Sequence, residues 1–159
     1  MDKKIVSRAK LRRIVADLKR RNKTIVTTNG AFDMFHYGHL KSLKLAKERG
    51  DVLIVCLNSD SSIKNYKSIK RPIIPEVERA EIMAAIQYVD YVILFDERTP
   101  TSLLEMIRPD VHVKGSEYGK VMPERETIEK NGGVVFLMRR DKSDVSTSKI
   151  IDKILWTYR

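Results

Sequence analysis

Residues 23–58 read KTIVTTNGAFDMFHYGHLKSLKLAKERGDVLIVCLN, and the order of elements in this stretch decides the fold. The β-branched run 24–28 predicts a strand, and the leucine spacing of 37–49 predicts a helix that Gly50 ends. Residues 52–57 form a continuous apolar run, which is typical of a strand in a parallel sheet covered on both faces. The stretch therefore predicts a β-α-β unit.

The alternation continues to the end of the chain. We expect further strands at 91–95, 111–114 and 134–138, and helices at 7–21, 76–87, 123–131 and 146–158. Pro75 should be the first residue of its helix, and another helix should begin behind an N-cap at Thr99 and end near Arg108, because Pro109 follows. Polar, lysine-rich residues 59–74 predict a mobile loop around a short helix.

This order predicts an α/β protein, a single Rossmann-like doubly wound domain over residues 1–159. It has a five-stranded parallel sheet with helices on both faces, and residues 1–22 form a basic helix that flanks the core. Ligands of such folds bind beyond the carboxyl ends of the strands. Four segments should therefore converge at one edge of the sheet: 29–39, 58–71, 114–118 and 139–148.

The charge balance favours an anionic partner. Lys and Arg number 31 against 21 Asp and Glu, a net charge of +10 that attracts nucleic acid, an anionic membrane or phosphorylated metabolites. The single cysteine, Cys56, lies in an apolar run, so we expect a buried thiol, no disulfide within the chain and a cytoplasmic location. The charged N-terminus lacks the apolar region of a signal peptide, and no apolar stretch is long enough to span a bilayer.

Two of the three histidines, His36 and His39, lie three residues apart at a predicted helix start, with Gly38 between them. A helix start offers free N–H groups and a positive dipole end, and Gly38 leaves room for a phosphate to approach. Both imidazoles can then donate hydrogen bonds to the same phosphate. Two alternatives stay open: ordinary packed or surface histidines, and a zinc site, although no third His or Cys pair lies nearby.

Residues 32–39, Phe-Asp-x-x-His-x-Gly-His, resemble the HxGH motif of the cytidylyltransferase-like nucleotidyltransferase superfamily. Further segments are similar to the adenylyltransferase domain of bacterial heptose-phosphate enzymes: 58–60, 71–73, 78–80, 95–100, 108–115 and 144–151. Together they resemble D-glycero-β-D-manno-heptose 1-phosphate adenylyltransferases over residues 24–151. Two segments depart from that family: 67–72 replaces a Lys-Gly-x-x-Arg-Pro type, and Gly-Ser-Glu-Tyr at 115–118 replaces Gly-Gly-Asp-Tyr.

The resemblance implies an enzyme that transfers AMP from ATP to a sugar 1-phosphate, releases pyrophosphate and forms ADP-heptose. It implies a stand-alone transferase without the fused sugar kinase of many relatives, a homodimer by analogy, and no nucleic-acid or membrane partner. Mg²⁺ is expected on the triphosphate and not on protein side chains, since it prefers phosphate oxygens and water.

The implied site residues fall into three groups. Those expected in catalysis are His36, His39, Lys67 and Arg71. Those expected to bind the nucleotide are Asn29, Gly30, Ala31, Phe32, Gly38, Lys114, Gly115, Ser146, Thr147 and Ser148. Those expected to bind the acceptor are Asp33, which relatives use to contact substrate or order the loop, with Asn58, Asp60 and Arg139. Two alternatives without a binding role remain open: the loop lysines can be solvated surface charges, and Ser146 can be a helix cap. We expect His112 to be structural, because it alternates into a strand interior.

Other functions remain open. Glycerol-3-phosphate cytidylyltransferases and FMN adenylyltransferases (FAD synthetases) share the HxGH motif and the layout, although segments 95–100 and 108–115 favour the heptose type. A non-catalytic nucleic-acid-binding module would suit the basic helix and the net charge. However, aromatic residues make up only 7% of the chain, few for a stacking platform.

Overall fold

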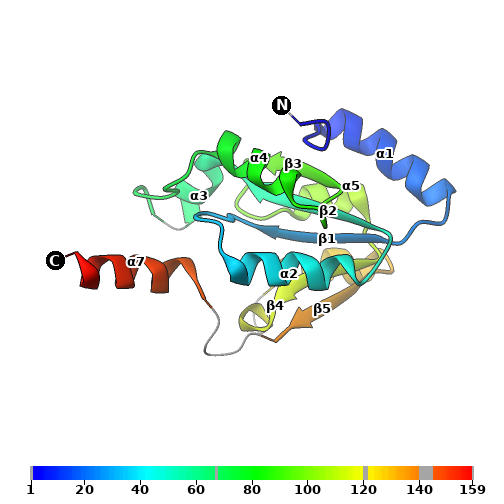
Figure 1. Ribbon diagram of the computed structural model, residues 1–159. Helices are drawn as coiled ribbons and strands as arrows, with labels where there is room; N and C mark the ends of the chain where they lie inside the picture. Colours follow the sequence, from blue (N-terminus) through cyan, green and yellow to red (C-terminus); the bar gives the residue numbers. More distant parts are fainter. Residues whose placement is uncertain (1, 67, 120–121, 140–144, 159) are drawn as a thin grey trace.

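The computed structural model describes residues 2–66, 68–119, 122–139 and 145–158. Five strands form one sheet: β1 (Ile25–Gly30), β2 (Val52–Asn58), β3 (Tyr91–Phe95), β4 (Val111–Gly115) and β5 (Val134–Met138). All pairs are parallel, in the order β3-β2-β1-β4-β5. The predicted doubly wound α/β fold is confirmed, with β1 at the centre of the sheet (Figure 1).

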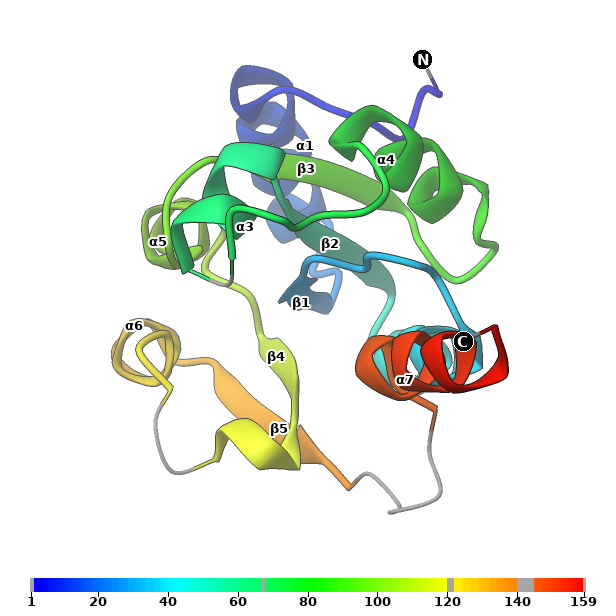
Figure 2. The same cartoon turned by 90° about the vertical axis from the view of Figure 1, so that its left-hand side faces the viewer.

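One face of the sheet is covered by α2 (Tyr37–Lys47) and α4 (Glu76–Ala85). Leu43 of α2 and Met83 of α4 are fully buried against alternate residues of the strands, such as Val26 and Val55. Because successive side chains of a strand point to opposite faces, the remaining strand residues form a second core. Figure 2 shows the two layers of helices around the sheet.

The second core lies under α1 (Arg8–Arg20), α5 (Thr101–Ile107) and α6 (Arg125–Lys130). Leu11, Val15 and Leu18 of α1, the helix that the sequence predicted to flank the core, are buried in it. The segment before α1 also pairs with the sheet, since the backbone N–H of Val6 donates to the carbonyl of Val92. The basic residues occupy the outer side of α1, and its apolar side is part of the core.

Two predicted helix starts differ from the structure. Thr99 is not the N-cap of α5, because the helix begins at Thr101 with Pro100 as its N-cap, and the Leu104 N–H donates to the Pro100 carbonyl. The Thr99 hydroxyl bonds to the hydroxyl of Thr101 instead. Pro75 is likewise the N-cap of α4 and not its first residue.

The carboxyl edge of the sheet carries the remaining elements: α3 (Asp60–Tyr66), the 3₁₀ turn η1 (Ser116–Tyr118) and α7 (Thr147–Thr157). Helix α7 has no buried residue and extends past the start of α2 (Figures 1 and 2). Cys56 is fully buried, as predicted. None of the helices that the structure describes has both the length and the apolar character needed to cross a membrane.

Candidate functional site

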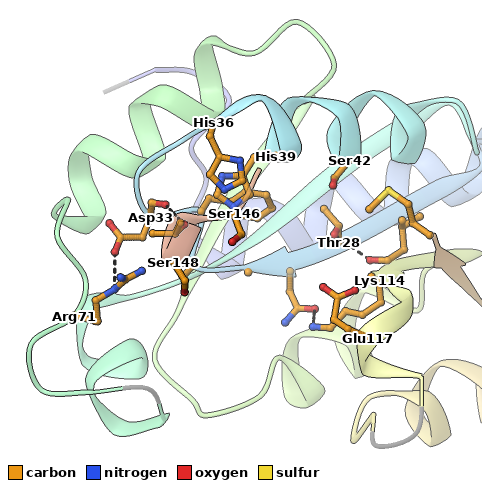
Figure 3. Close-up of a pocket in the computed structure, with 18 of the residues that line it drawn as sticks. Thr28, Asp33, His36, His39, Ser42, Arg71, Lys114, Glu117, Ser146 and Ser148 are labelled. Carbon is orange, nitrogen blue, oxygen red and sulfur yellow. Dashed lines mark hydrogen bonds and ion pairs between the residues drawn. The ribbon is translucent and has the colours of Figure 1, made fainter. Parts of the chain in front are cut away.

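A cavity of about 410 Å³ opens at the carboxyl ends of β1 and β4, beside the starts of α2 and α7. The strand order reverses between β1 and β4, and ligands of doubly wound sheets bind in such a crevice. Each of the four segments that the sequence predicted to converge contributes to the cavity wall. Figure 3 shows their side chains gathered around one space.

The rings of His36 and His39 stack at this cavity, with centroids 3.8 Å apart and planes inclined by 20°. His36 is the N-cap residue of α2, and His39 lies in the first helical turn, where its N–H donates to the His36 carbonyl. Phe32 and Phe35 pack against the His39 ring at centroid distances of 5.2 and 5.7 Å. The aromatic contacts fix the imidazole pair at the mouth of the sheet (Figure 3).

Gly38 allows close packing at the start of α2. A Cβ atom here would lie 2.7 Å from the Val145 carbonyl oxygen and 3.1 Å from the His36 ring. Gly38 is buried and does not line the cavity formed by the described residues. Its missing side chain therefore lets the start of α2 approach the chain that leads into α7.

The buried carboxylate of Asp33 organises the loop that follows α3. It accepts hydrogen bonds from the backbone N–H groups of Ile73 at 3.0 Å and Ile74 at 2.9 Å. It also pairs with the Arg71 guanidinium, whose Nε lies 3.1 Å from an Asp33 oxygen (Figure 3). The Asp33 carbonyl accepts from the Thr147 hydroxyl at 3.0 Å. Asp33 therefore connects the β1–α2 turn to both Arg71 and α7.

Across the crevice, Lys114 at the end of β4 donates to the Asn29 side-chain oxygen at 2.5 Å. Its ammonium also lies 3.6 Å from a carboxylate oxygen of the buried Glu124. Burial lowers the pKa of Lys114 below its usual value, while the Glu124 carboxylate opposes that change. The ion pair with Glu124 favours the charged form of Lys114, which lies beside the end of β1.

The start of α7 completes the wall with Ser146, Thr147 and Ser148. The Ser146 side chain accepts from the Lys149 N–H at 3.3 Å and therefore caps the helix. Helix capping was one of the two roles that the sequence suggested for this serine. The starts of α2 and α7 both face the cavity, and free N–H groups at helix starts favour anions. The arrangement is suited to a phosphate chain.

The cavity brings together most residues named from the sequence. It is lined by Asn29, Gly30, Ala31, Phe32, Asp33, His36, His39, Arg71, Lys114, Gly115, Ser146, Thr147 and Ser148. Asn58 borders a neighbouring cavity. The Asp60 carboxylate is bound to Arg79 at 2.7 Å, and the exposed Arg139 follows β5 and is not among the described residues that line the cavity. Lys67 lies outside the described residues.

Arg79 of α4 is a residue whose part the sequence did not reveal. It is 1% exposed and donates to the carbonyls of Ala31 and Asn58 at 2.6 and 2.8 Å, and to the carbonyl of Ile74 at 2.9 Å. It thereby ties α4 to the ends of β1 and β2. The motif at 78–80 marked the position, but nothing local in the sequence indicated these long-range partners.

Six further residues line the cavity without having been named as site residues: Thr28, Ser42, Ser68, Val113, Glu117 and Met138. Glu117 lies within the segment 115–118 that departs from the family pattern, and this departure was the available signal. Thr28 and Ser42 carry no such signal, because hydroxyl residues are common in strands and helices.

Comparison with known proteins agrees with the geometry. The cytidylyltransferase-like family model matches residues 27–153. The chain is 47% identical over 161 residues to the bifunctional protein HldE of Geobacter metallireducens, and 45% identical over 159 residues to that of Syntrophotalea carbinolica. Each alignment covers 99% of this chain and 32% of the relative, so the chain spans about a third of the length of these relatives.

Solved structures are similar as well. The crystal structure of the lipopolysaccharide core biosynthesis protein from Thermoplasma volcanium GSS1 superposes with a TM-score of 0.62 at 31% identity, covering 77% of this chain and 99% of that one. Pantoate-beta-alanine ligase from Francisella tularensis has a TM-score of 0.66 at 14% identity over 94% of this chain and 77% of its own, which shows the fold alone. With the family model over residues 27–153 and the stacked histidines of its motif at the cavity, the chain belongs to the cytidylyltransferase-like family.

Proposed function

We propose that this protein is a nucleotidyltransferase that transfers AMP from ATP to a sugar 1-phosphate and releases pyrophosphate. The proposed acceptor is D-glycero-β-D-manno-heptose 1-phosphate, and the product is ADP-heptose. The observation that carries the proposal is the stacked imidazole pair between two helix starts in one cavity. The heptose-type motifs along residues 24–151 and the name of the Thermoplasma relative support the choice of acceptor.

In the proposed reaction an oxygen of the acceptor phosphate attacks the α-phosphorus of ATP. The new P–O bond joins the two phosphates, and the bond from the α-phosphorus to the bridging oxygen breaks, so that its electron pair leaves with pyrophosphate. A phosphate oxygen is already nucleophilic at neutral pH, and no general base is needed. The protein then contributes alignment and charge stabilisation.

Each wall of the cavity has a part in this proposal. His36 and His39 donate hydrogen bonds to the α- and β-phosphates, and the start of α7 holds the β- and γ-phosphates. Arg71 and Lys114 approach from opposite sides and neutralise charge as the phosphorus becomes five-coordinate. Their placement on opposite walls suits an in-line displacement.

Mg²⁺ is proposed to enter with ATP. Within residues 2–66, 68–119, 122–139 and 145–158, no three His, Cys, Asp or Glu side chains are grouped so that they could hold a metal ion. Phosphate oxygens and water are the ligands that Mg²⁺ prefers, and the metal would neutralise part of the triphosphate charge. We therefore expect the ion to depend on bound nucleotide.

A pyrophosphate-release screen tests the function. ATP and CTP are each paired with heptose 1-phosphate, glycerol 3-phosphate, FMN and phosphopantetheine, with and without Mg²⁺. We expect turnover with ATP and heptose 1-phosphate. Turnover only with CTP and glycerol 3-phosphate, or only with ATP and FMN, would replace the proposed acceptor. No release from any pair, together with salt-sensitive RNA binding in a gel shift, would refute the enzymatic role.

By analogy with the family, the proposed working state is a cytoplasmic homodimer. A reducing compartment suits a chain whose single thiol is fully buried. Light scattering on the purified protein measures its mass in solution, and the mass of a monomer at enzyme-assay concentrations would refute the dimer.

A further inference from the structure

Two further cavities adjoin each other at the amino edge of the sheet, opposite the edge that carries the stacked histidines. One, of about 560 Å³, is a groove between α1 and α5. The other, of about 360 Å³, is lined by Thr24, Asp110 and Gly133, the residues that directly precede β1, β4 and β5. The two cavities share Lys19 of α1 and Arg108 at the end of α5. Figure 1 shows α1 ending near the start of β1, far from α7.

The walls of these two cavities carry more cations than carboxylates. The Glu105 carboxylate is already paired with the Lys130 ammonium at 3.1 Å, and that of Asp110 accepts from the first backbone N–H of β1 at 2.7 Å. Lys19 and Arg108 form no ion pair with any other residue that the structure describes. The cations on the walls are Arg12, Lys19, Lys23 and Arg108, and the carboxylates are Glu105 and Asp110.

The backbone of Arg108 is unusual for a residue with a side chain. Its φ of 48° and ψ of 65° place it in the left-handed region, where the end of a helix normally has glycine. An arginine in this conformation lowers stability relative to glycine, which favours a role for its guanidinium beyond ending α5. The side chain stands at the boundary between the two cavities.

Lys19 and Arg108 also repel each other. Partial burial lowers the pKa of Lys19, the Asp110 carboxylate opposes this change, and the charge of Arg108 adds to it. A bound anion between the ammonium and the guanidinium would relieve the repulsion, because it attracts both groups.

The chemistry of the walls selects a phosphate group. A guanidinium binds two phosphate oxygens with its planar fork, and an ammonium adds a point charge. The side-chain amide of Asn22 adds a neutral donor on the same walls. None of the described residues that line the two cavities is aromatic, so there is no platform on which nucleobases could stack. A cavity of about 360 Å³ is in the size range of small-molecule sites, about 300–1,000 Å³.

We propose that Lys19 and Arg108 form a second anion site, which binds a phosphate group of a small phosphorylated ligand at the amino edge of the sheet. None of the described residues lines both this site and the cavity of the stacked histidines. The inference goes beyond the proposed transferase reaction and does not depend on it.

Calorimetric titration with tripolyphosphate, in a buffer of low ionic strength without Mg²⁺, tests the proposal. The wild type should bind one tripolyphosphate at the amino edge and one in the cavity of the histidines. Lys19→Gln should weaken only the first event, by about 10-fold, because it removes a charged hydrogen-bond donor. Arg108→Gly should do the same without lowering the midpoint of urea unfolding, since glycine suits the left-handed backbone.

Two controls assign the events. Lys10→Gln makes the same change of charge on an exposed residue of α1 that lines neither cavity, and it should leave both events unchanged. His36→Ala should weaken only the event at the carboxyl edge. A wild type that binds one tripolyphosphate, which Lys19→Gln weakens and His36→Ala does not, would count against the transferase site and support this one.

Three results would overturn the inference. Cations at helix ends also interact favourably with the helix dipole, so a lower urea midpoint with unchanged binding in Lys19→Gln would assign that role instead. Equal weakening by Lys10→Gln and Lys19→Gln would reduce the effect to the net charge of the chain. Single-stranded RNA that binds the wild type in a gel shift, and that tripolyphosphate does not displace, would replace the small ligand by a nucleic acid.

Discussion

His112 should make the protein sensitive to mild acid. The side chain is fully buried in β4, and its Nδ1 lies 2.8 Å from the Thr27 hydroxyl. Burial, with a smaller contribution from the charge of Lys114, lowers the pKa of His112 from 6.5 to about 3. The native imidazole therefore stays neutral at pH values where the unfolded chain takes up a proton.

The size of the effect follows from linkage. The unfolded state binds more protons between pH 6.5 and about 3, so the free energy of unfolding falls as the pH falls through that window. Above pH 6.5 the stability is fully present, and below about 3 both states are protonated. For these two pKa values, the loss between pH 7 and pH 5 is about 2 kcal/mol.

Urea unfolding followed by circular dichroism at pH 7, 6 and 5 measures this loss. His112→Gln removes the titrating group, so its unfolding free energy should fall by about 2 kcal/mol less than that of the wild type between pH 7 and 5. Parallel profiles for the wild type and His112→Gln would refute the account.

Four further outcomes are expected. Replacing His36 or His39 with Ala should lower kcat about 100-fold or more, as for loss of a preorganised donor to a developing negative charge, and wild-type pyrophosphate release by both variants would contradict the phosphate-holding role. Asp33→Asn should lower kcat/KM about 10- to 100-fold and speed proteolysis of the loop that the carboxylate holds, whereas an unchanged cleavage rate would count against that contact. Leu11→Ala should cost about 2–5 kcal/mol in urea unfolding, and a loss below about 1 kcal/mol would mean that α1 is dispensable for the core. Burial raises the pKa of the Cys56 thiol to about 12, so a disulfide reagent should label it only after unfolding, and rapid labelling of the native protein would refute its burial.

The strands were the most predictable part of the fold. Two of them, β3 and β5, have the predicted bounds, β2 and β4 each end one residue later than predicted, and β1 begins one residue later and ends two residues later. Apolar runs determine this result, because a strand buried on both faces tolerates few polar residues. The ends of helices are harder to predict from the sequence, because they depend on individual hydrogen bonds. The preference of threonine for N-cap positions predicted that Thr99 caps α5. In the structure Pro100 is the N-cap residue, and its carbonyl accepts the first helical hydrogen bond.

The site was predictable where its residues are close in sequence and less so where they meet across the fold. The turn from β1 into α2 gave the two histidines and their neighbours directly. The sequence could not show that Asp33 would accept from the N–H groups of Ile73 and Ile74, about forty positions later, because that contact depends on how two loops pack. The same holds for Arg79, whose four acceptors come from three separate segments.

The position of β1 at the middle of the sheet has a consequence for how substrate preference can diverge. Its last residues form the partition between two chambers, one facing the beginnings of α2 and α7 and the other facing the ends of β2 and β3. Substitutions at the far walls of one chamber leave the far walls of the other in place. A protein built this way can change the residues that line one chamber without changing those that line the other, provided that the end of β1 is preserved.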